Sequence, residues 1–131
     1  MVESRKINPW TWQDQFGFSQ AIETSGHKRV LRCSDQTAVN ANGEPQHAGD
    51  IAKQPGLALD NLEAVLKEAD MTLANLVRLN LYTTDIDGVL QHYELVEHRL
   101  KAAGIQPAVT LLASREPELK LRARRDRHSA R

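Results

Sequence analysis

Within residues 76–83, positions 77–82 alternate strictly between apolar side chains and polar or aromatic ones, and this alternation constrains the fold more than any other part of the chain. In an extended chain, successive side chains point to opposite faces of the sheet. Val77, Leu79 and Leu81 therefore share one face, and the residues between them share the other. We predict a β-strand whose apolar face is covered by a helix.

The segment before this strand is predicted to form a helix that ends near Ala69, because its apolar residues recur every three or four positions. Asp50 is a candidate N-cap for this helix. Pro55 conflicts with a start at Asp50, since a proline inside a helix removes a hydrogen bond and clashes with the preceding turn. The regular helix is therefore expected to begin at Gln54 or Pro55.

The segment after the strand is predicted to form a second helix, with Asp85 or Asp87 as its cap and Gly104 as the C′ residue that ends it. Its apolar residues again follow helical spacing, which predicts one inward face. The residues expected on that face are Val89, Leu90, Tyr93, Val96 and Leu100.

Residues 108–113 and 30–34 are also predicted to be strands, with residues 18–24 as the hairpin partner of residues 30–34. The order of two strands, helix, strand, helix and strand indicates an α+β fold with both helices packed on one face of a mixed β-sheet. Such a layer leaves the other sheet face bare, and self-association is the simplest way to cover it. We expect one domain over residues 1–131, with residues 120–131 as a basic tail.

The overall charge gives no reason to expect nucleic acid or a membrane as a partner, because 17 basic and 17 acidic residues balance to a net charge of zero. The single cysteine, Cys33, cannot form an internal disulfide, which favours a reducing compartment. The N-terminus lacks the apolar core of a signal peptide, and no later segment approaches a membrane span. We therefore predict a cytoplasmic protein.

Several short motifs follow one another along the chain, namely Phe18-Ser19-Gln20-Ala21, Cys33-Ser34-Asp35-Gln36, Gly49-Asp50-Ile51, Asp60-Asn61-Leu62, Leu81-Tyr82-Thr83-Thr84-Asp85 and Gly104-Ile105-Gln106-Pro107-Ala108. In this order they resemble the YjgF/RidA family, an older name for which is L-PSP endoribonuclease. The resemblance covers nearly the whole chain and implies a chorismate mutase-like fold and a homotrimer whose sheets form a central barrel. It also implies small-molecule clefts between neighbouring subunits and deamination of 2-imino and enamine acids.

Val109 departs from the pattern of that family. In family members the Pro-Ala pair is followed by an arginine that holds the carboxylate of the substrate, because a planar guanidinium matches both carboxylate oxygens. Here Pro107 and Ala108 are followed by a valine. We therefore expect little or no deaminase activity toward substrates with a carboxylate, and we assign no catalytic residue.

The resemblance also implies the residues that line the cleft, which are Phe18, Ser34, Asp35, Gln36, Tyr93, Val109 and Thr110. Asp35 stands where relatives usually have glycine, and its carboxylate would repel an anionic ligand and favour a neutral or cationic one. Alternatively, Asp35 turns away and caps a loop. Phe18 replaces a frequent tyrosine. Tyr93 replaces a frequent asparagine, and it could supply a polar group to the cleft or simply pack in the core.

The C-terminal tail departs most from the family. Relatives end in a strand of the type Val-Glu-Ile-Glu, whose glutamate is proposed to orient the attacking water, and the corresponding position here is near Arg124. Leu119, Leu121 and Ala123 could still form an edge strand. A frameshift is one hypothesis for the tail, since residues 124–129 can be encoded by CGU CGA GAU CGA CAC AGC, which gives Val-Glu-Ile-Asp-Thr one base later. Gene codons that exclude this shifted frame would remove the hypothesis.

Three functions remain open on these grounds. The first is a RidA-type deaminase with weakened or lost chemistry, the second is a non-catalytic metabolite-binding protein, and the third is an L-PSP-type endoribonuclease or translation inhibitor. The basic tail has no aromatic residue to stack on a base, which weighs against the third. No cofactor is expected, and no metal site either, because His92 and His98 lie on different faces of the second predicted helix.

Overall fold

A four-stranded mixed sheet forms the centre of the protein, whose computed structural model describes residues 3–113, 120–122 and 128–129. The strand order is β4 (Asp35–Thr37), β7 (Lys120–Arg122), β5 (Arg78–Thr83) and β6 (Ala108–Ala113). β5 and β6 run parallel, whereas β7 is antiparallel to both β4 and β5. The predicted strands at residues 76–83 and 108–113 and the mixed character of the sheet are therefore confirmed.

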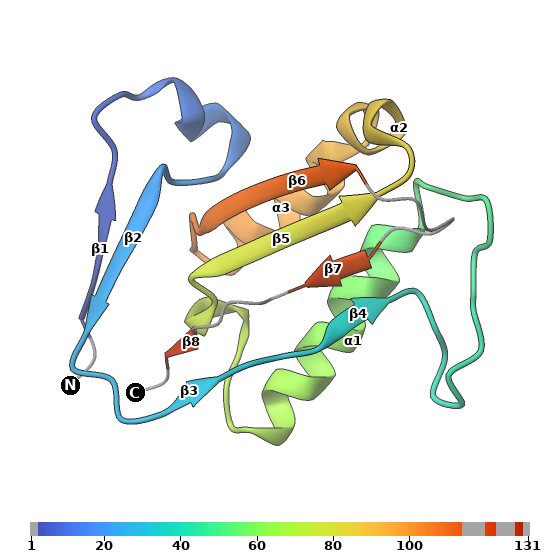
Figure 1. Cartoon of the computed structure of the whole chain (residues 1–131), viewed down its shortest axis with the longest axis horizontal. Coiled ribbons are helices and arrows are strands. Elements are labelled where there is room, and N and C mark those ends of the chain that lie inside the picture. Colours follow the sequence, from blue (N-terminus) through green and yellow to red (C-terminus); the bar gives the residue numbers. More distant parts are fainter. Residues whose placement is uncertain (1–2, 114–119, 123–127, 130–131) are drawn as a thin grey trace.

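β7 corrects the prediction for the start of the basic tail. An edge strand was one interpretation of this segment, but β7 lies inside the sheet, paired with β4 on one side and β5 on the other (Figure 1). The physical reason is that β6 occupies only one side of β5, so the backbone groups on its other side need a partner. Leu119 and Ala123 lie outside the described residues.

The predicted hairpin between residues 18–24 and 30–34 is wrong. β2 (Ala21–Ser25) pairs instead with β1 (Glu3–Ile7), and the short β3 (Val30–Leu31) pairs with β8 (His128–Ser129). β1 was missed because its sequence, Glu-Ser-Arg-Lys-Ile, is polar and mostly exposed, so it lacks the apolar alternation that marks a half-buried strand.

The first long helix, α1 (Gln54–Glu68), begins at Gln54 as predicted, with Pro55 in its first turn. The Asp50 carboxylate accepts hydrogen bonds from the backbone N–H groups of Ala52 and Lys53, at 3.2 and 3.3 Å, in the turn just before the helix. Asp50 therefore caps that turn, and the helix proper starts where the proline allows it.

The second predicted helix consists of two helices, α2 (Ile86–Gln91) and α3 (Tyr93–Ala102), with His92 between them. Asp85 caps α2 as predicted, because its carboxylate accepts a hydrogen bond from the N–H of Gly88 at 2.9 Å. Gly104 follows α3 with a φ of 72°, the left-handed conformation expected at C′. Two short 3-10 helices, η1 (Trp12–Phe16) and η2 (Leu73–Asn75), complete the helical elements of the described residues.

The interruption at His92 explains why one inward residue was predicted wrongly. Val89, Val96 and Leu100 are buried, but Leu90 is 57% exposed. The prediction assumed one continuous helix, and a break at His92 changes the angular phase between the two pieces.

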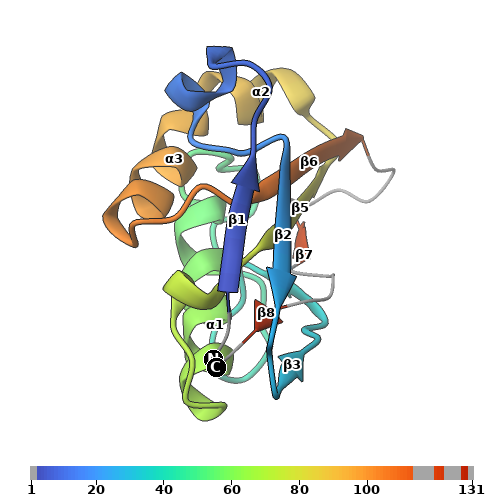
Figure 2. The same ribbon diagram turned by 90° about the vertical axis from the view of Figure 1, so that its left-hand side faces the viewer.

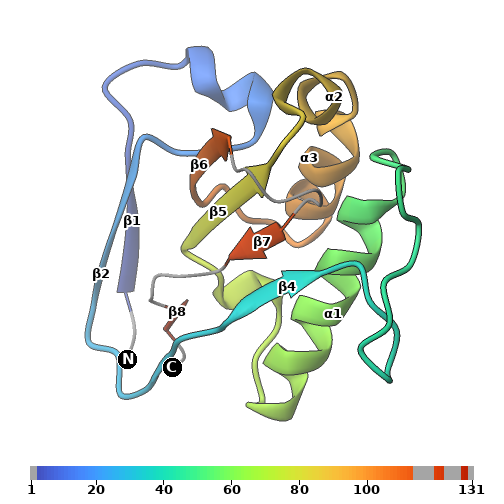
Figure 3. The same cartoon turned by 45° about the vertical axis from the view of Figure 1, so that its right-hand side comes forward.

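α1 and α3 lie side by side on one face of the four-stranded sheet (Figures 1 and 2), so the predicted layer arrangement is confirmed. α1 runs behind β4, and α2 lies near the end of β6 (Figure 3). The core between the layers is formed mainly by Leu59, Leu62, Leu66, Leu79, Leu81, Val96 and Leu100, all at most 1% exposed. In the described part of the chain, no helix covers the opposite face of this sheet (Figure 2).

Candidate small-molecule pocket

An open pocket of about 340 Å³ lies between the segment around η1, the α2–α3 region and strand β6. Its lining consists of Phe16, Phe18, Leu90, Tyr93, Val109 and Leu111. These side chains are apolar except for the hydroxyl of Tyr93. A volume of this size falls within the range of small-molecule sites, which begins near roughly 300 Å³.

Phe18, Tyr93 and Val109 come from three distant segments, and the fold brings these three predicted site residues together at this pocket. Val109 and Leu111 are two positions apart on β6, so they share the face that packs against the core. The valine that replaces the expected arginine therefore contributes directly to the pocket wall.

The other four predicted site residues do not line this pocket within one chain. Gln36 and Asp35 belong to β4, at the opposite edge of the sheet from β6, and Ser34 precedes them. Thr110 lies on β6 but faces away from Val109, and its hydroxyl accepts a hydrogen bond from the Nη2 of Arg78. The predicted site is thus divided between the two edges of the sheet.

Phe16, Leu90 and Leu111 also line the pocket but were not predicted as site residues. Leu111 could have been found from alternation, since it is two residues after Val109 on the same strand. Leu90 was predicted to be a core residue, although its exposure of 57% leaves it at the rim of the pocket. Phe16 lies on a 3-10 helix that no sequence pattern indicated.

The segment that carries Phe18 is fastened to the chain just before Val109. The Nε2 of Gln106 donates hydrogen bonds to the backbone carbonyl of Phe18 and to the carboxylate of Asp14, both at 2.7 Å. The N–H of Ser19 donates to the carbonyl of Pro107 at 2.9 Å, and the Ser19 hydroxyl donates to the carbonyl of Gln106. These contacts fix the distance between the two walls of the pocket.

Gly17 allows this segment to approach α3 closely. Its φ of 77° is left-handed, and a Cβ at this position would lie 3.1 Å from the Cγ of Glu97. Glycine is the residue that adopts this conformation without steric cost. The two phenylalanines on either side of Gly17 are thereby placed next to the helix that carries Tyr93.

Tyr93 supplies the one polar group of the pocket lining. Burial raises the pKa of its phenol to about 12, and the nearby carboxylate of Glu97 adds to this rise. The hydroxyl has no hydrogen-bond partner among the described residues. At neutral pH it is therefore protonated and can both donate and accept one hydrogen bond.

Cys33 is half-buried and packs against the core, and burial raises the pKa of its thiol. A raised thiol pKa reduces the thiolate fraction, so Cys33 is a poor nucleophile. It lies just after β3, which is shorter than the strand that was predicted over residues 30–34. In the part of the chain that the structure describes, no group of three or more His, Cys, Asp or Glu side chains could hold a metal ion. Nor is any described helix both long and apolar enough to cross a membrane.

Comparison with known proteins identifies relatives of this fold. Residues 13–117 match the family model described as Endoribonuclease L-PSP. The chain is 34% identical to the mitochondrial protein mmf2 of Schizosaccharomyces pombe over 98 residues, which cover 74% of this chain and 71% of that protein. It is 28% identical to a RutC family protein of Aquifex aeolicus over 99 residues, or 76% of each chain.

A solved structure supports the same grouping. The Rid family protein YyfB of Yersinia pestis, described as being of unknown function, has a TM-score of 0.77 and 30% sequence identity, and the match covers 90% of this chain and 94% of that one. The family match extends over most of the chain, and its range of residues 13–117 includes the residues that line the pocket. The chain therefore belongs to the L-PSP endoribonuclease family, which is also called the YjgF or Rid family.

Proposed function

We propose that this protein binds a small molecule in the pocket beside β6 and has little or no 2-imino acid deaminase activity. The observation that carries the proposal is the side chain of Val109, which forms part of the pocket wall at the position where the family resemblance implies a carboxylate-binding arginine. A valine offers neither charge nor hydrogen bonds, so the fold is retained without the group that would grip an acidic substrate.

The surroundings of the pocket do not replace the missing cation. None of the described lining residues is basic. Arg78 is the neighbouring guanidinium on β5, but its side chain binds the hydroxyl of Thr110, which points to the other face of the sheet from Val109. An unpaired carboxylate in such surroundings loses its hydration without compensation, which costs several kcal/mol.

We also infer that the complete site forms in a homotrimer. The pocket lies at the β6 edge of the sheet, whereas the predicted site residues Ser34, Asp35 and Gln36 lie at the β4 edge. Two strands, β7 and β5, separate β4 from β6 in this sheet, so these residues share a cleft only if the β6 edge of one copy adjoins the β4 edge of another. Such an arrangement supports a cleft between subunits and would also cover the bare sheet face.

Release of ammonia from 2-imino acids tests the catalytic part of the proposal. The imino acids are generated in place by an amino-acid oxidase, and ammonia is measured with and without this protein. We expect a rate no faster than spontaneous hydrolysis, while a family member with arginine after the Pro-Ala pair serves as the positive control. Rapid ammonia release by the wild-type protein would refute our interpretation of Val109.

Val109→Arg alone is not expected to restore the reaction. The variant regains a cation, but Phe18 and Tyr93 still replace the tyrosine and asparagine that relatives frequently have, and the position of the expected glutamate is occupied by Arg124, which lies outside the described residues. The same ammonia assay measures the outcome, with circular dichroism as the check on folding. Full activity in this variant would show that the carboxylate-binding arginine is the only catalytic requirement that the wild-type chain lacks.

RNA cleavage is the alternative that the family description raises. The net charge of zero supplies no general electrostatic attraction to phosphates, so this function has less physical support. A labelled RNA incubated with the purified protein distinguishes the two functions. Salt-sensitive binding with cleavage would favour the alternative, and we infer that neither occurs.

We also infer a cytoplasmic location, although the relative mmf2 is named as mitochondrial.

A further inference from the structure

We infer that the ligand of this pocket is an uncharged molecule with an aromatic or branched apolar body and one hydrogen-bonding group, which the hydroxyl of Tyr93 recognises. This inference rests on the proposed function, because it assumes that the pocket beside β6 is the binding site. It adds the chemical class of the ligand, which follows from the shape, polarity and charge of the lining residues.

The walls of the pocket select an apolar body. The lining includes two aromatic rings, Phe16 and Phe18, from the segment around η1, and two branched side chains, Val109 and Leu111, from β6. Burial of apolar surface contributes about 25 cal/mol per Å², and aromatic pairs add a preference for edge-to-face or offset stacking. A ring or a branched chain fills about 340 Å³ of such space better than a polar molecule does.

Among the lining residues of one chain, Tyr93 is the residue that selects the head group of the ligand. Its hydroxyl is the one hydrogen-bonding side-chain group of the lining, and in the described part of the chain nothing already satisfies it. A ligand with one amide, hydroxyl or carbonyl group could pair with it. A ligand with several polar groups would leave most of them without partners, which is costly in an apolar site.

The electrostatics of the pocket favour a neutral ligand over an ion of either sign. The lining residues of this chain carry no charge, so an ion of either sign would lose its hydration there without a partner. The carboxylate of Glu97 acts on the lining, since it contributes to the raised pKa of Tyr93, but Lys101 pairs with it at 2.6 Å. This pairing reduces both its repulsion of an anion and its attraction for a cation, so a neutral ligand is favoured.

Trp12 provides a direct reporter of occupancy. Its ring packs edge to face on Phe18 with 5.9 Å between the centroids, and Phe18 lines the pocket. The chain has two tryptophans, and Trp10 is 58% exposed. A Trp10→Phe variant therefore leaves Trp12 as the only indole, and a ligand that contacts Phe18 should change its fluorescence.

Three probes with the same phenyl ring test the inference, namely phenylacetamide, phenylacetate and 2-phenylethylamine. They are titrated at neutral pH against the Trp10→Phe variant of the full chain, and ligand-observed NMR confirms contact. We expect phenylacetamide to bind at least about tenfold more tightly than either ion, a difference of about 1.4 kcal/mol. In the Trp10→Phe, Val109→Arg double variant, the preference should shift toward phenylacetate.

Tyr93→Phe tests the head group, with Tyr82→Phe as the matched control from another strand. The Tyr93 variant should bind phenylacetamide several-fold more weakly and leave the affinity for ethylbenzene, which has no head group, unchanged. Equal or tighter binding of phenylacetate, or no saturable response to phenylacetamide in the low-millimolar range, would overturn the inference. These outcomes are independent of the ammonia assay, so failure of the ligand class and failure of the proposed function can be told apart.

Discussion

At the scale of the residue, Tyr93 is the group whose chemistry the fold alters most clearly. Its phenol pKa is raised from 10 to about 12, first by burial and second by the Glu97 carboxylate. We predict that absorbance titration of a Tyr82→Phe variant, in which Tyr93 is the only tyrosine, gives a midpoint near 12. Glu97→Gln should lower this midpoint by less than burial raises it. A midpoint near 10 in the folded protein would contradict the prediction.

The same shift has a defined effect on stability. The unfolded chain releases the Tyr93 proton near pH 10, whereas the folded chain keeps it until about pH 12. In this interval the folded state binds more protons, so the free energy of unfolding falls as the pH rises from 10 to 12. Below pH 10 both states keep the proton, and Tyr93 causes no pH dependence. The difference in unfolding free energy between wild type and Tyr93→Phe, measured by denaturant titration, should change with pH only in that interval.

Single residues of the pocket differed in how well they could be predicted from the sequence. Phe18, Tyr93 and Val109 were identified because each stands at a position that the family resemblance marks. Gln106 belongs to one of the motifs, but no role could be assigned to it from the sequence. Its side-chain amide donates the hydrogen bond that joins the Phe18 segment to the chain just before Val109. Such a role depends on two segments far apart in sequence, so local patterns cannot reveal it.

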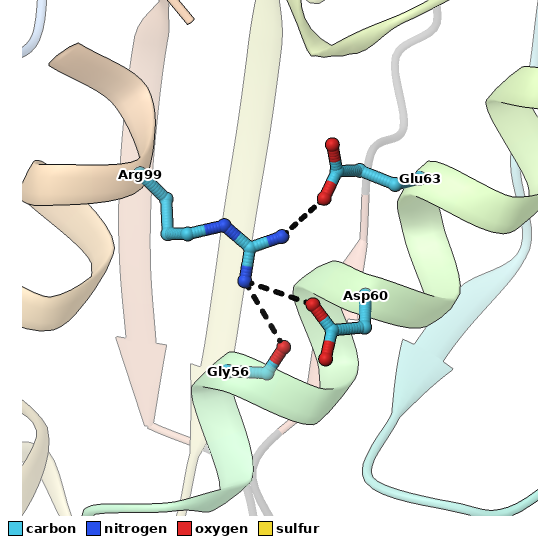
Figure 4. A network of polar contacts seen from close by, with 4 residues as sticks. All are labelled: Gly56, Asp60, Glu63 and Arg99. Carbon is cyan, nitrogen blue, oxygen red and sulfur yellow. Dashed lines mark hydrogen bonds and ion pairs between the residues drawn. The ribbon is translucent and has the colours of Figure 1, made fainter. Parts of the chain in front are cut away.

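At the scale of the element, Arg99 is the main polar link between α3 and α1 in the described part of the chain (Figure 4). One nitrogen of its guanidinium lies 3.0 Å from Asp60 and donates to the carbonyl of Gly56 at 3.3 Å, and the other binds Glu63. The Arg99 side chain is 26% exposed, so these ion pairs are only partly screened by solvent.

We predict that Arg99→Met destabilises the protein by about 1 to 2 kcal/mol, because exposed ion pairs each contribute up to about 1 kcal/mol and the hydrogen bond to Gly56 is also lost. The effect should shrink at high salt. Lys101→Met is the matched control, since Lys101 makes one ion pair within α3 and is 57% exposed. Denaturant unfolding measures the free energy of unfolding of both variants. Equal losses would show that the contacts of Arg99 with α1 add no more stability than the ion pair of Lys101 within α3.

The elements that could be predicted share a simple physical basis. α1 was placed correctly because Pro55 is compatible only with the first turn, and β5 because its alternation matches a half-buried strand. β1 is polar, and its pairing with β2 depends on backbone hydrogen bonds that leave no trace in side-chain patterns. The interruption at His92 was missed because the apolar spacing continues across it.

At the scale of the whole molecule, one face of the four-stranded sheet stays uncovered by helices in the described part of a single chain. Leu112 on this face is 44% exposed. Asn80, on the neighbouring strand, is 6% exposed and its Oδ1 has no hydrogen-bond partner among the described residues. An exposed leucine and a buried, unpaired amide oxygen on the same sheet face favour a second copy or ordered water against this face. The bare face could be predicted from alternation in residues 76–83, but its geometry could not.

Leu112→Glu is therefore predicted to break the homotrimer and, with it, ligand binding. A charge on the sheet face would have to be buried between subunits without a partner, whereas the free chain can leave it in water.

Leu95→Glu is the matched control, because Leu95 on α3 is 43% exposed and borders a groove on the helix layer rather than the sheet face. Light scattering coupled to size-exclusion chromatography should give three times the chain mass for wild type and Leu95→Glu, and one chain mass for Leu112→Glu. Since Ser34, Asp35 and Gln36 would come from the neighbouring copy, the phenylacetamide response of Trp12 should weaken in parallel. A monomeric wild-type protein would place the site within one chain and refute the shared cleft. A Leu112→Glu variant that stays trimeric would show that Leu112 is not buried between subunits.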